Sequence, residues 1–140
     1  MTLTKVFVNT LRMATTQKRP TKGELAILRV LWERGPKTVR EIHGELNESK
    51  PTGYTTVLKL LQIMTEKNLV ERDETVRPQI YKARYTQSQT QKHLLSDLIH
   101  GAFGGSVKAL VMQALSTKRP SPKELEAIEK LLDRFDGGTK

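Results

Sequence analysis

The sequence of 140 residues predicts a mainly helical protein with one small β-hairpin near its middle. Three observations predict this fold class. Apolar residues recur with helical spacing over most of the chain, and Ser or Thr stands three residues before Glu at three expected helix starts. Alternation of apolar and polar residues, which is typical of strands, is confined to residues 69–85.

Charge and cysteine content narrow the possible functions. The net charge is +9, and it is uneven: residues 1–85 hold 16 basic and 9 acidic side chains, a balance of +7, whereas residues 86–140 hold 8 and 6, a balance of +2. This favours a module that binds a polyanion followed by a different region; a merely solvated basic surface is the alternative. The absence of cysteine excludes disulfides and thiolate chemistry and fits a reducing cytoplasm.

The sequence gives little indication of a membrane protein or an enzyme. No apolar run approaches the ~18 to 20 residues of a membrane span, so we predict a cytoplasmic protein without membrane insertion. The sequence has neither a GxxxxGK[ST] phosphate loop nor a GxSxG nucleophile elbow, so we predict no enzyme, no catalytic residue and no cofactor. His93, Asp97 and His100 have a spacing that could surround a metal ion, but we favour a polar rim of an interface helix and predict no metal site.

Residues 1–20 contain Lys5, Arg12, Lys18 and Arg19 and no acidic residue. We expect a flexible basic arm, either one that contacts DNA or a disordered tail. Met13 opens a typical protein start, MATTQKRP, so residues 1–12 are either a misassigned start or a dispensable extension.

Two helices are expected next. Thr21 and Glu24 form a capping box for a helix that Gly35-Pro36 stops at Arg34, with an apolar stripe of Leu25, Leu28, Leu31 and Trp32. Thr38 and Glu41 form a second capping box for a short helix that places Val39, Ile42 and Leu46 on one face. The Asn47 to Gly53 segment is then a turn.

The stretch from Pro51 to Asn68 is predicted to be a DNA-reading helix. Val57, Leu60, Leu61 and Met64 have the spacing of one buried helical face, and polar side chains cover the other: Thr55, Thr56, Lys59, Gln62 and Glu66. These hydroxyl, amide and ammonium groups can bond phosphates or base edges, and Leu58 could pack on a thymine methyl.

The ends of this helix carry their own signals. Gly53 is expected as the N-cap, Thr52 or Thr55 could satisfy free N–H groups there, and the helix dipole makes that end attractive to phosphate. Asn68 is expected to end the helix in the left-handed conformation.

A β-hairpin follows, with strands over Leu69–Asp73 and Gln79–Tyr85 and a turn from Glu74 to Pro78. Tyr81, Ala83 and Tyr85 lie on one face of the second strand. A hairpin directly after a recognition helix is the wing of a winged helix-turn-helix domain. Arg77 at its tip is expected to reach a phosphate or a narrow minor groove; a solvated turn residue is the alternative.

The predicted DNA-binding residues are Thr52, Tyr54, Thr55, Thr56, Lys59, Gln62 and Arg77. The predicted divisions are a basic arm over residues 1–20, a winged-helix domain over 21–85 and a helical dimerisation region over 86–140.

The last region is expected to be helical from Ser88 onward, with stretches at 93–102, 106–115 and 121–135; Ser121 and Glu124 form a third capping box, and Gly137-Gly138 ends the last helix. Three short helices have little volume for a private core, so their apolar faces are expected to bury each other in a homodimer. The alternative is an extra helical layer on a monomer. The predicted dimerisation residues are Leu95, Leu98, Ile99, Leu110, Val111, Leu125, Ile128 and Leu132.

Thr21 to about Phe135 resembles the penicillinase-repressor and methicillin-resistance-repressor family of bacterial transcription factors. The segments that carry the resemblance are ELAILRVLWERGPKTVREI, YTTVLKLLQIMTEKNLV, the wing end RPQIYKA and FGGSVKALVMQAL. The resemblance implies a homodimeric winged-helix repressor on a palindromic operator. It also implies release by cleavage in the dimerisation half, triggered by a sensor protein and acting near Gly101 to Gly105.

A winged helix can instead bind protein without specific DNA binding, because fold alone does not fix function. The balance of +7 on the half that holds the recognition helix favours DNA.

Overall fold

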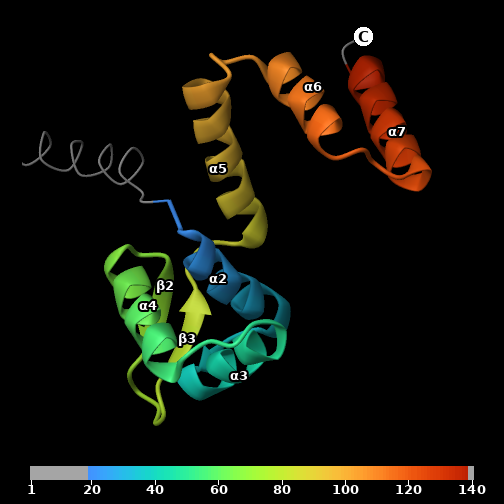
Figure 1. The fold of residues 1–140 in the computed structure, drawn as a ribbon. Helices are drawn as coiled ribbons and strands as arrows, with labels where there is room; N and C mark the ends of the chain where they lie inside the picture. Colours follow the sequence, from blue (N-terminus) through green and yellow to red (C-terminus); the bar gives the residue numbers. More distant parts are fainter. Residues whose placement is uncertain (1–18, 139–140) are drawn as a thin grey trace, which may run out of the picture. The chain divides into compact units, whose positions relative to one another are not determined.

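The computed structural model describes residues 19–138 (Figure 1). The described residues form two compact units, and the boundary between them lies between Leu94 and Leu95. The division falls inside a helix, nine residues beyond the end of the predicted winged-helix domain at residue 85. Residues 1–18, which make up most of the predicted basic arm, lie outside the described residues. That arm and the three predicted divisions therefore stay predictions.

The first two helices of unit 1 are α2 (Lys22–Arg34) and α3 (Val39–Ser49), and both begin at the predicted capping boxes. At α2 the Thr21 Oγ1 accepts from the Glu24 N–H, and the Glu24 carboxylate accepts from the Thr21 N–H. Thr38 and Glu41 repeat the arrangement at α3, where the hydrogen bonds from Thr38 lower the pKa of Glu41. Gly35 adopts the left-handed φ of 82° that lets the chain leave α2.

The predicted recognition helix is α4 (Tyr54–Glu66), with Gly53 as its N-cap as expected. Val57, Leu61 and Met64 are buried, and Leu60 is half-buried. Asn68 has a φ of 63°, which confirms the left-handed end. The predicted face and both predicted end signals are therefore present.

The wing is a three-stranded antiparallel sheet rather than a simple hairpin. Its strands are β1 (Lys37–Thr38), β2 (Val70–Asp73) and β3 (Ile80–Ala83), in the order β1-β3-β2. β2 and β3 confirm the predicted hairpin with shorter ends, and the structure adds a third strand that the sequence did not predict. β1 has only two residues, too few for an alternating pattern, and it forms by pairing Lys37 with Tyr81 across the sheet.

The core of unit 1 brings together one face of each helix and the inner face of the sheet. Trp32 is half-buried beside it, and its indole Nε1 donates to the Tyr85 carbonyl at 2.9 Å. Leu25, which the predicted stripe included, is only partly buried, whereas Ile27, which it omitted, is fully buried. The buried apolar residues are Ile27, Leu28, Leu31, Ile42, Val57, Leu61, Met64, Leu69, Val70 and Tyr81.

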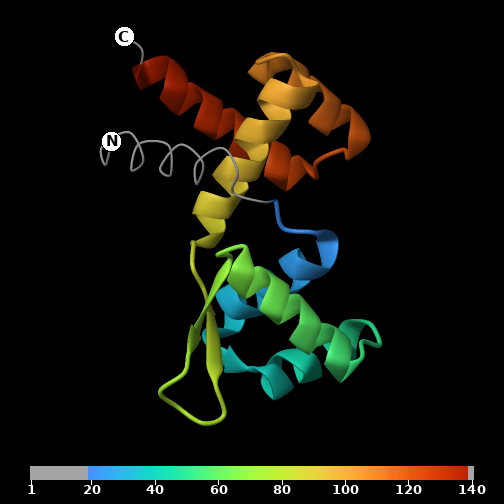
Figure 2. The same ribbon diagram turned by 90° about the vertical axis from the view of Figure 1, so that its left-hand side faces the viewer.

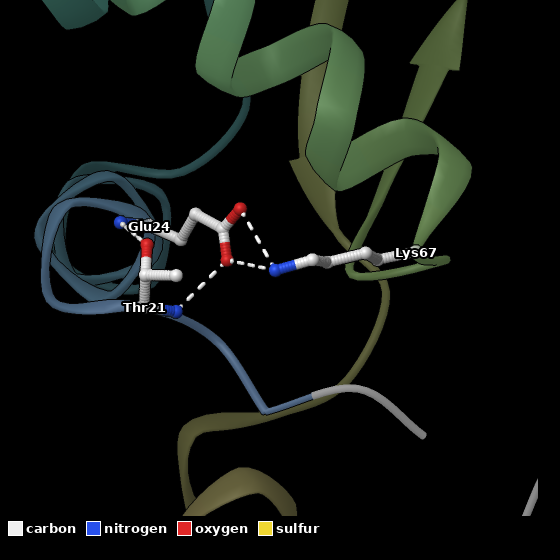
Figure 3. A network of polar contacts seen from close by, with 3 residues as sticks. All are labelled: Thr21, Glu24 and Lys67. Atoms are coloured by element: carbon white, nitrogen blue, oxygen red, sulfur yellow. Dashed lines mark hydrogen bonds and ion pairs between the residues drawn. The ribbon is translucent and has the colours of Figure 1, made fainter. Parts of the chain in front are cut away.

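Unit 1 also buries one charged side chain, that of Glu24. Glu24 is 1% exposed, and its carboxylate accepts two hydrogen bonds from the Lys67 ammonium, at 2.8 and 3.1 Å, in addition to the capping bond from Thr21 (Figure 3). The Lys67 side chain is 16% exposed. The start of α2 is therefore tied to the residue that ends α4.

The second half of the chain contains α5 (Gln87–Ala102), α6 (Val107–Thr117) and α7 (Pro122–Gly138), so α5 starts within one residue of the predicted Ser88. Gly101 and Ala102 still belong to α5, so the break before α6 covers Phe103 to Ser106 and only partly overlaps Gly101 to Gly105, the region of cleavage that the resemblance implies. In the part of the chain that the structure describes, no single helix is long and apolar enough to cross a membrane; α5 and α6 pass that test only together, with a bend of 103° between them.

Replacing Lys67 by Met should destabilise unit 1 by about 2 to 3 kcal/mol, because it leaves a buried carboxylate without its cation. The double variant Glu24→Gln/Lys67→Met should lose less, because Gln can still accept from Thr21 and carries no charge. Urea unfolding of the full-length chain, followed by fluorescence of Trp32, measures both. If Lys67→Met is as stable as the double variant, the unpaired Glu24 carboxylate is not costly and the ion pair does not stabilise unit 1.

Candidate DNA-binding surface

The polar face of α4 points away from the core of unit 1. Tyr54, Thr55, Thr56, Lys59 and Gln62 are all exposed, as a surface that reads DNA requires. Leu58 and Ile63 are half-buried at the edges of this face. The first turn of α4 and the turn between β2 and β3 lie at the same end of unit 1, the lower end in both views (Figures 1 and 2).

Thr52 differs from the other predicted contact residues. It is half-buried, and its hydroxyl donates to the Lys50 carbonyl at 2.9 Å. Its backbone N–H and carbonyl are bonded to side chains of α3. The hydroxyl of Thr52 is thus engaged within the turn, whereas those of Thr55 and Thr56 lie on the exposed face.

The N-terminus of α4 receives no side-chain cap. Neither Thr52 nor Thr55 fills the capping role that the sequence suggested. The other helices of residues 19–138 all have a hydroxyl that accepts from a backbone N–H of the first turn, supplied by Thr21, Thr38, Thr86, Ser106 and Ser121. The free N–H groups of α4 therefore stay available to an acceptor from outside, and a phosphate is the acceptor that this end of a helix favours.

The basic residues of the wing differ in whether they form ion pairs. Arg72 pairs with Glu74 at 2.6 Å, and Lys82 and Arg84 both lie near Glu71, at 3.4 and 4.0 Å. Arg77, at the tip, is exposed and forms no ion pair within residues 19–138. Each of the other basic residues of the β2–β3 hairpin thus lies beside a carboxylate, whereas Arg77 lies beside none among the described residues.

One carboxylate of the wing, that of Asp73, accepts hydrogen bonds from within the turn. Asp73 accepts from the hydroxyl and the backbone N–H of Thr75, and these bonds lower the pKa of Asp73 below its usual range. The negative charge of Asp73 is therefore hydrogen-bonded to a neighbouring residue of the same turn.

Lys59 on α4 and Lys50 in the turn before it are also exposed and without an ion pair among the described residues. Sequence reasoning did not select Lys50. Its position just before the recognition helix was the available signal, because a cation there adds to the positive end of the helix dipole. Lys50, Lys59 and Arg77 are therefore the candidate phosphate contacts of this surface.

The candidate metal ligands do not form a site. No group of three or more His, Asp or Glu side chains within residues 19–138 is arranged to hold a metal ion. His100 bonds through Nδ1 to the Ser96 carbonyl of its own helix at 2.9 Å.

The predicted dimerisation residues are not gathered into a core within one chain. Leu95, Leu98, Val111, Leu125 and Leu132 are exposed, and the other three are half-buried: Ile99, Leu110 and Ile128. Further exposed apolar residues accompany them, namely Val107, Met112, Leu115, Leu131 and Phe135.

Comparison with known proteins identifies relatives over most of the chain. The sequence profile of the penicillinase repressor family matches residues 20–134. The transcriptional regulator BlaI of Mycobacterium tuberculosis is 29% identical over 117 residues, which are 82% of this chain and 83% of the relative. The penicillinase repressor of Staphylococcus aureus is 19% identical over 121 residues, 86% of this chain and 96% of that protein.

A solved structure of reduced AbfR bound to DNA aligns with 99% of this chain and 88% of its own, with a TM-score of 0.42 and 17% identity.

Lys59→Ala should weaken binding to specific DNA by about 1 to 3 kcal/mol if the ammonium meets a base edge. Fluorescence anisotropy measures this, with the duplex that the full-length chain selects from a randomised pool. Arg29→Ala is the matched control, because Arg29 is an exposed cation beside the groove between α2 and α3. If Lys59→Ala and Thr55→Ala both bind like the unchanged chain, α4 does not read DNA.

Arg77→Ala should weaken selected and random duplexes by similar factors, because a phosphate contact carries no sequence information. The slope of log affinity against log salt should flatten by about one unit. Salt titrations with both duplexes test this. A loss confined to one base position would make Arg77 a base reader instead.

Proposed function

We propose that this chain, which belongs to the penicillinase repressor family, is a homodimeric repressor that binds a palindromic operator. The chain is a DNA-binding transcriptional regulator and not an enzyme. The dimer, the palindrome and the mode of release are the proposal. It acts in the cytoplasm, where its DNA lies.

The observation that carries the proposal is the absence of buried side chains among the described residues of α6 and α7. Leu132 is 58% exposed and Phe135 is 67% exposed, although both lie on α7, whose apolar residues have helical spacing. Exposed apolar surface of this extent is unfavourable in water, and covering it stabilises the chain by roughly 25 cal/mol for each Å². A second copy of the same helices supplies matching apolar faces and gives a closed two-fold assembly.

Two-fold symmetry would also raise the affinity of the winged-helix unit for its operator. Each subunit presents one α4, and a dimer places two of them in successive major grooves about one helical turn apart. Because the subunits are linked, binding of one subunit to its half-site gives the other subunit a high effective concentration at the second half-site. The apparent affinity of the dimer therefore exceeds that of one subunit, typically by ~10² to 10⁴-fold. A palindromic operator is the sequence that matches such a dimer.

Release by proteolysis is part of the same proposal. The break between α5 and α6 contains Gly104 and Gly105, both exposed and both with left-handed φ values of 55° and 86°. A cut there removes α6 and α7 and, with them, most of the exposed apolar residues of the second half. The remaining DNA-binding unit would lose its dimer linkage, so a sensor protease would need to cut only once.

Leu132→Asp should convert the dimer to monomers, because it buries an unpaired carboxylate in the proposed interface. Sedimentation velocity of the full-length chain at micromolar concentration should show the change, and affinity for the selected duplex should fall ~10² to 10⁴-fold. Gln113→Asp, which adds the same charge at an exposed polar position of α6, is the control. A monomeric unchanged chain would refute the dimeric repressor.

A further inference from the structure

We propose that His43 and Asn47 of α3 form a clamp that positions the first turn of the recognition helix for sequence-specific DNA binding. The inference rests on the proposed function, since it assumes that α4 reads DNA. Nothing in the sequence pattern of α4 itself points to these two residues, which lie on the preceding helix.

The clamp acts on a single residue, Thr52. The His43 Nε2 lies 2.7 Å from the Thr52 carbonyl oxygen, and the Asn47 Oδ1 accepts from the Thr52 N–H at 3.0 Å. A carbonyl oxygen only accepts, so Nε2 must carry the proton and donate. His43 and Asn47 are four residues apart and share one face of α3. Both backbone polar groups of Thr52 are therefore bound by side chains from one helix.

The same imidazole also contacts the first residue of α4. The rings of His43 and Tyr54 meet edge to face, with centroids 5.7 Å apart and an angle of 79° between their planes. Thr52 and Tyr54 lie on either side of Gly53, the N-cap. His43 thus holds the chain both before and after the point where α4 begins.

This hold is important because the start of α4 has little else to fix it. The N-cap is a glycine without a side chain, and no side chain caps the first turn. The turn from Lys50 to Gly53 is largely exposed, and α3 ends at Ser49 just before it. Since base readout needs side chains placed to within about half an ångström, a shift of this turn would misplace Thr55, Thr56 and Lys59 together.

A positioning role differs from a role in stability in what it affects. Phosphate contacts tolerate small displacements and set the affinity for random DNA, whereas base contacts set the preference for the selected sequence. Loss of the clamp should therefore reduce discrimination between duplexes more than it reduces binding to random DNA. A general loss of folding would lower both in proportion.

The test measures affinities of full-length variants for the duplex that the unchanged chain selects from a randomised pool and for a random duplex of equal length. His43→Ala should weaken the selected duplex about tenfold and the random duplex less than about threefold. His43→Gln should restore most of the loss, because its amide N–H can take the place of Nε2. Ser49→Ala, a neutral exposed position at the end of α3, is the control and should have no effect.

Asn47→Ala tests the second half of the clamp. The double variant His43→Ala/Asn47→Ala should lose less than the product of the two single losses, because both side chains hold the same peptide. Urea unfolding of each variant checks that the chains are folded under the binding conditions.

The clamp is overturned if His43→Ala discriminates between the duplexes as well as the unchanged chain does, if both affinities fall by the same factor, or if His43→Gln gives no rescue. The proposed function fails separately, when the unchanged chain itself does not prefer the selected duplex over the random one. In that case the role assigned to the clamp fails with it.

Discussion

The arrangement of the winged-helix unit depends on the buried carboxylate of Glu24. It completes the cap of α2 through Thr21 and binds the ammonium of Lys67 directly after α4 (Figure 3). A buried charge is costly unless it is fully paired, so packings that separate these helix ends are disfavoured. The apolar core gives most of the stability, and this ion pair adds a preference for one relative placement of α2 and the recognition helix. His43 and Asn47 act on the opposite end of α4.

The two halves of the chain satisfy different physical constraints. In residues 19–94, apolar side chains from α2, α3, α4 and the sheet bury one another in one core. In α6 and α7 the described apolar side chains are left largely exposed. Under the proposed function, loss of the dimer weakens DNA binding while the core of the winged-helix unit is kept.

Local signals in the sequence predicted most of the winged-helix unit. The capping boxes at Thr21 and Thr38, the glycine N-cap and the left-handed Asn68 depend on neighbouring residues only, and each is confirmed. Features that depend on residues far apart in the sequence were not predicted. β1 exists through its pairing with β3, and the burial of Glu24 depends on Lys67, 43 positions away. The exposed residues of α4 were predictable from periodicity, whereas the clamp at Thr52 needed the geometry of the turn.

In the proposed dimer, two copies of α4 read one operator from the same side of the duplex. Hydroxyl-radical footprinting of the full-length chain on its selected duplex tests this most directly. A dimer should give two protected patches related by a dyad and about one helical turn, roughly 10 base pairs, apart on one face of the DNA. A single protected patch at saturating protein, or two patches without dyad symmetry, would contradict it.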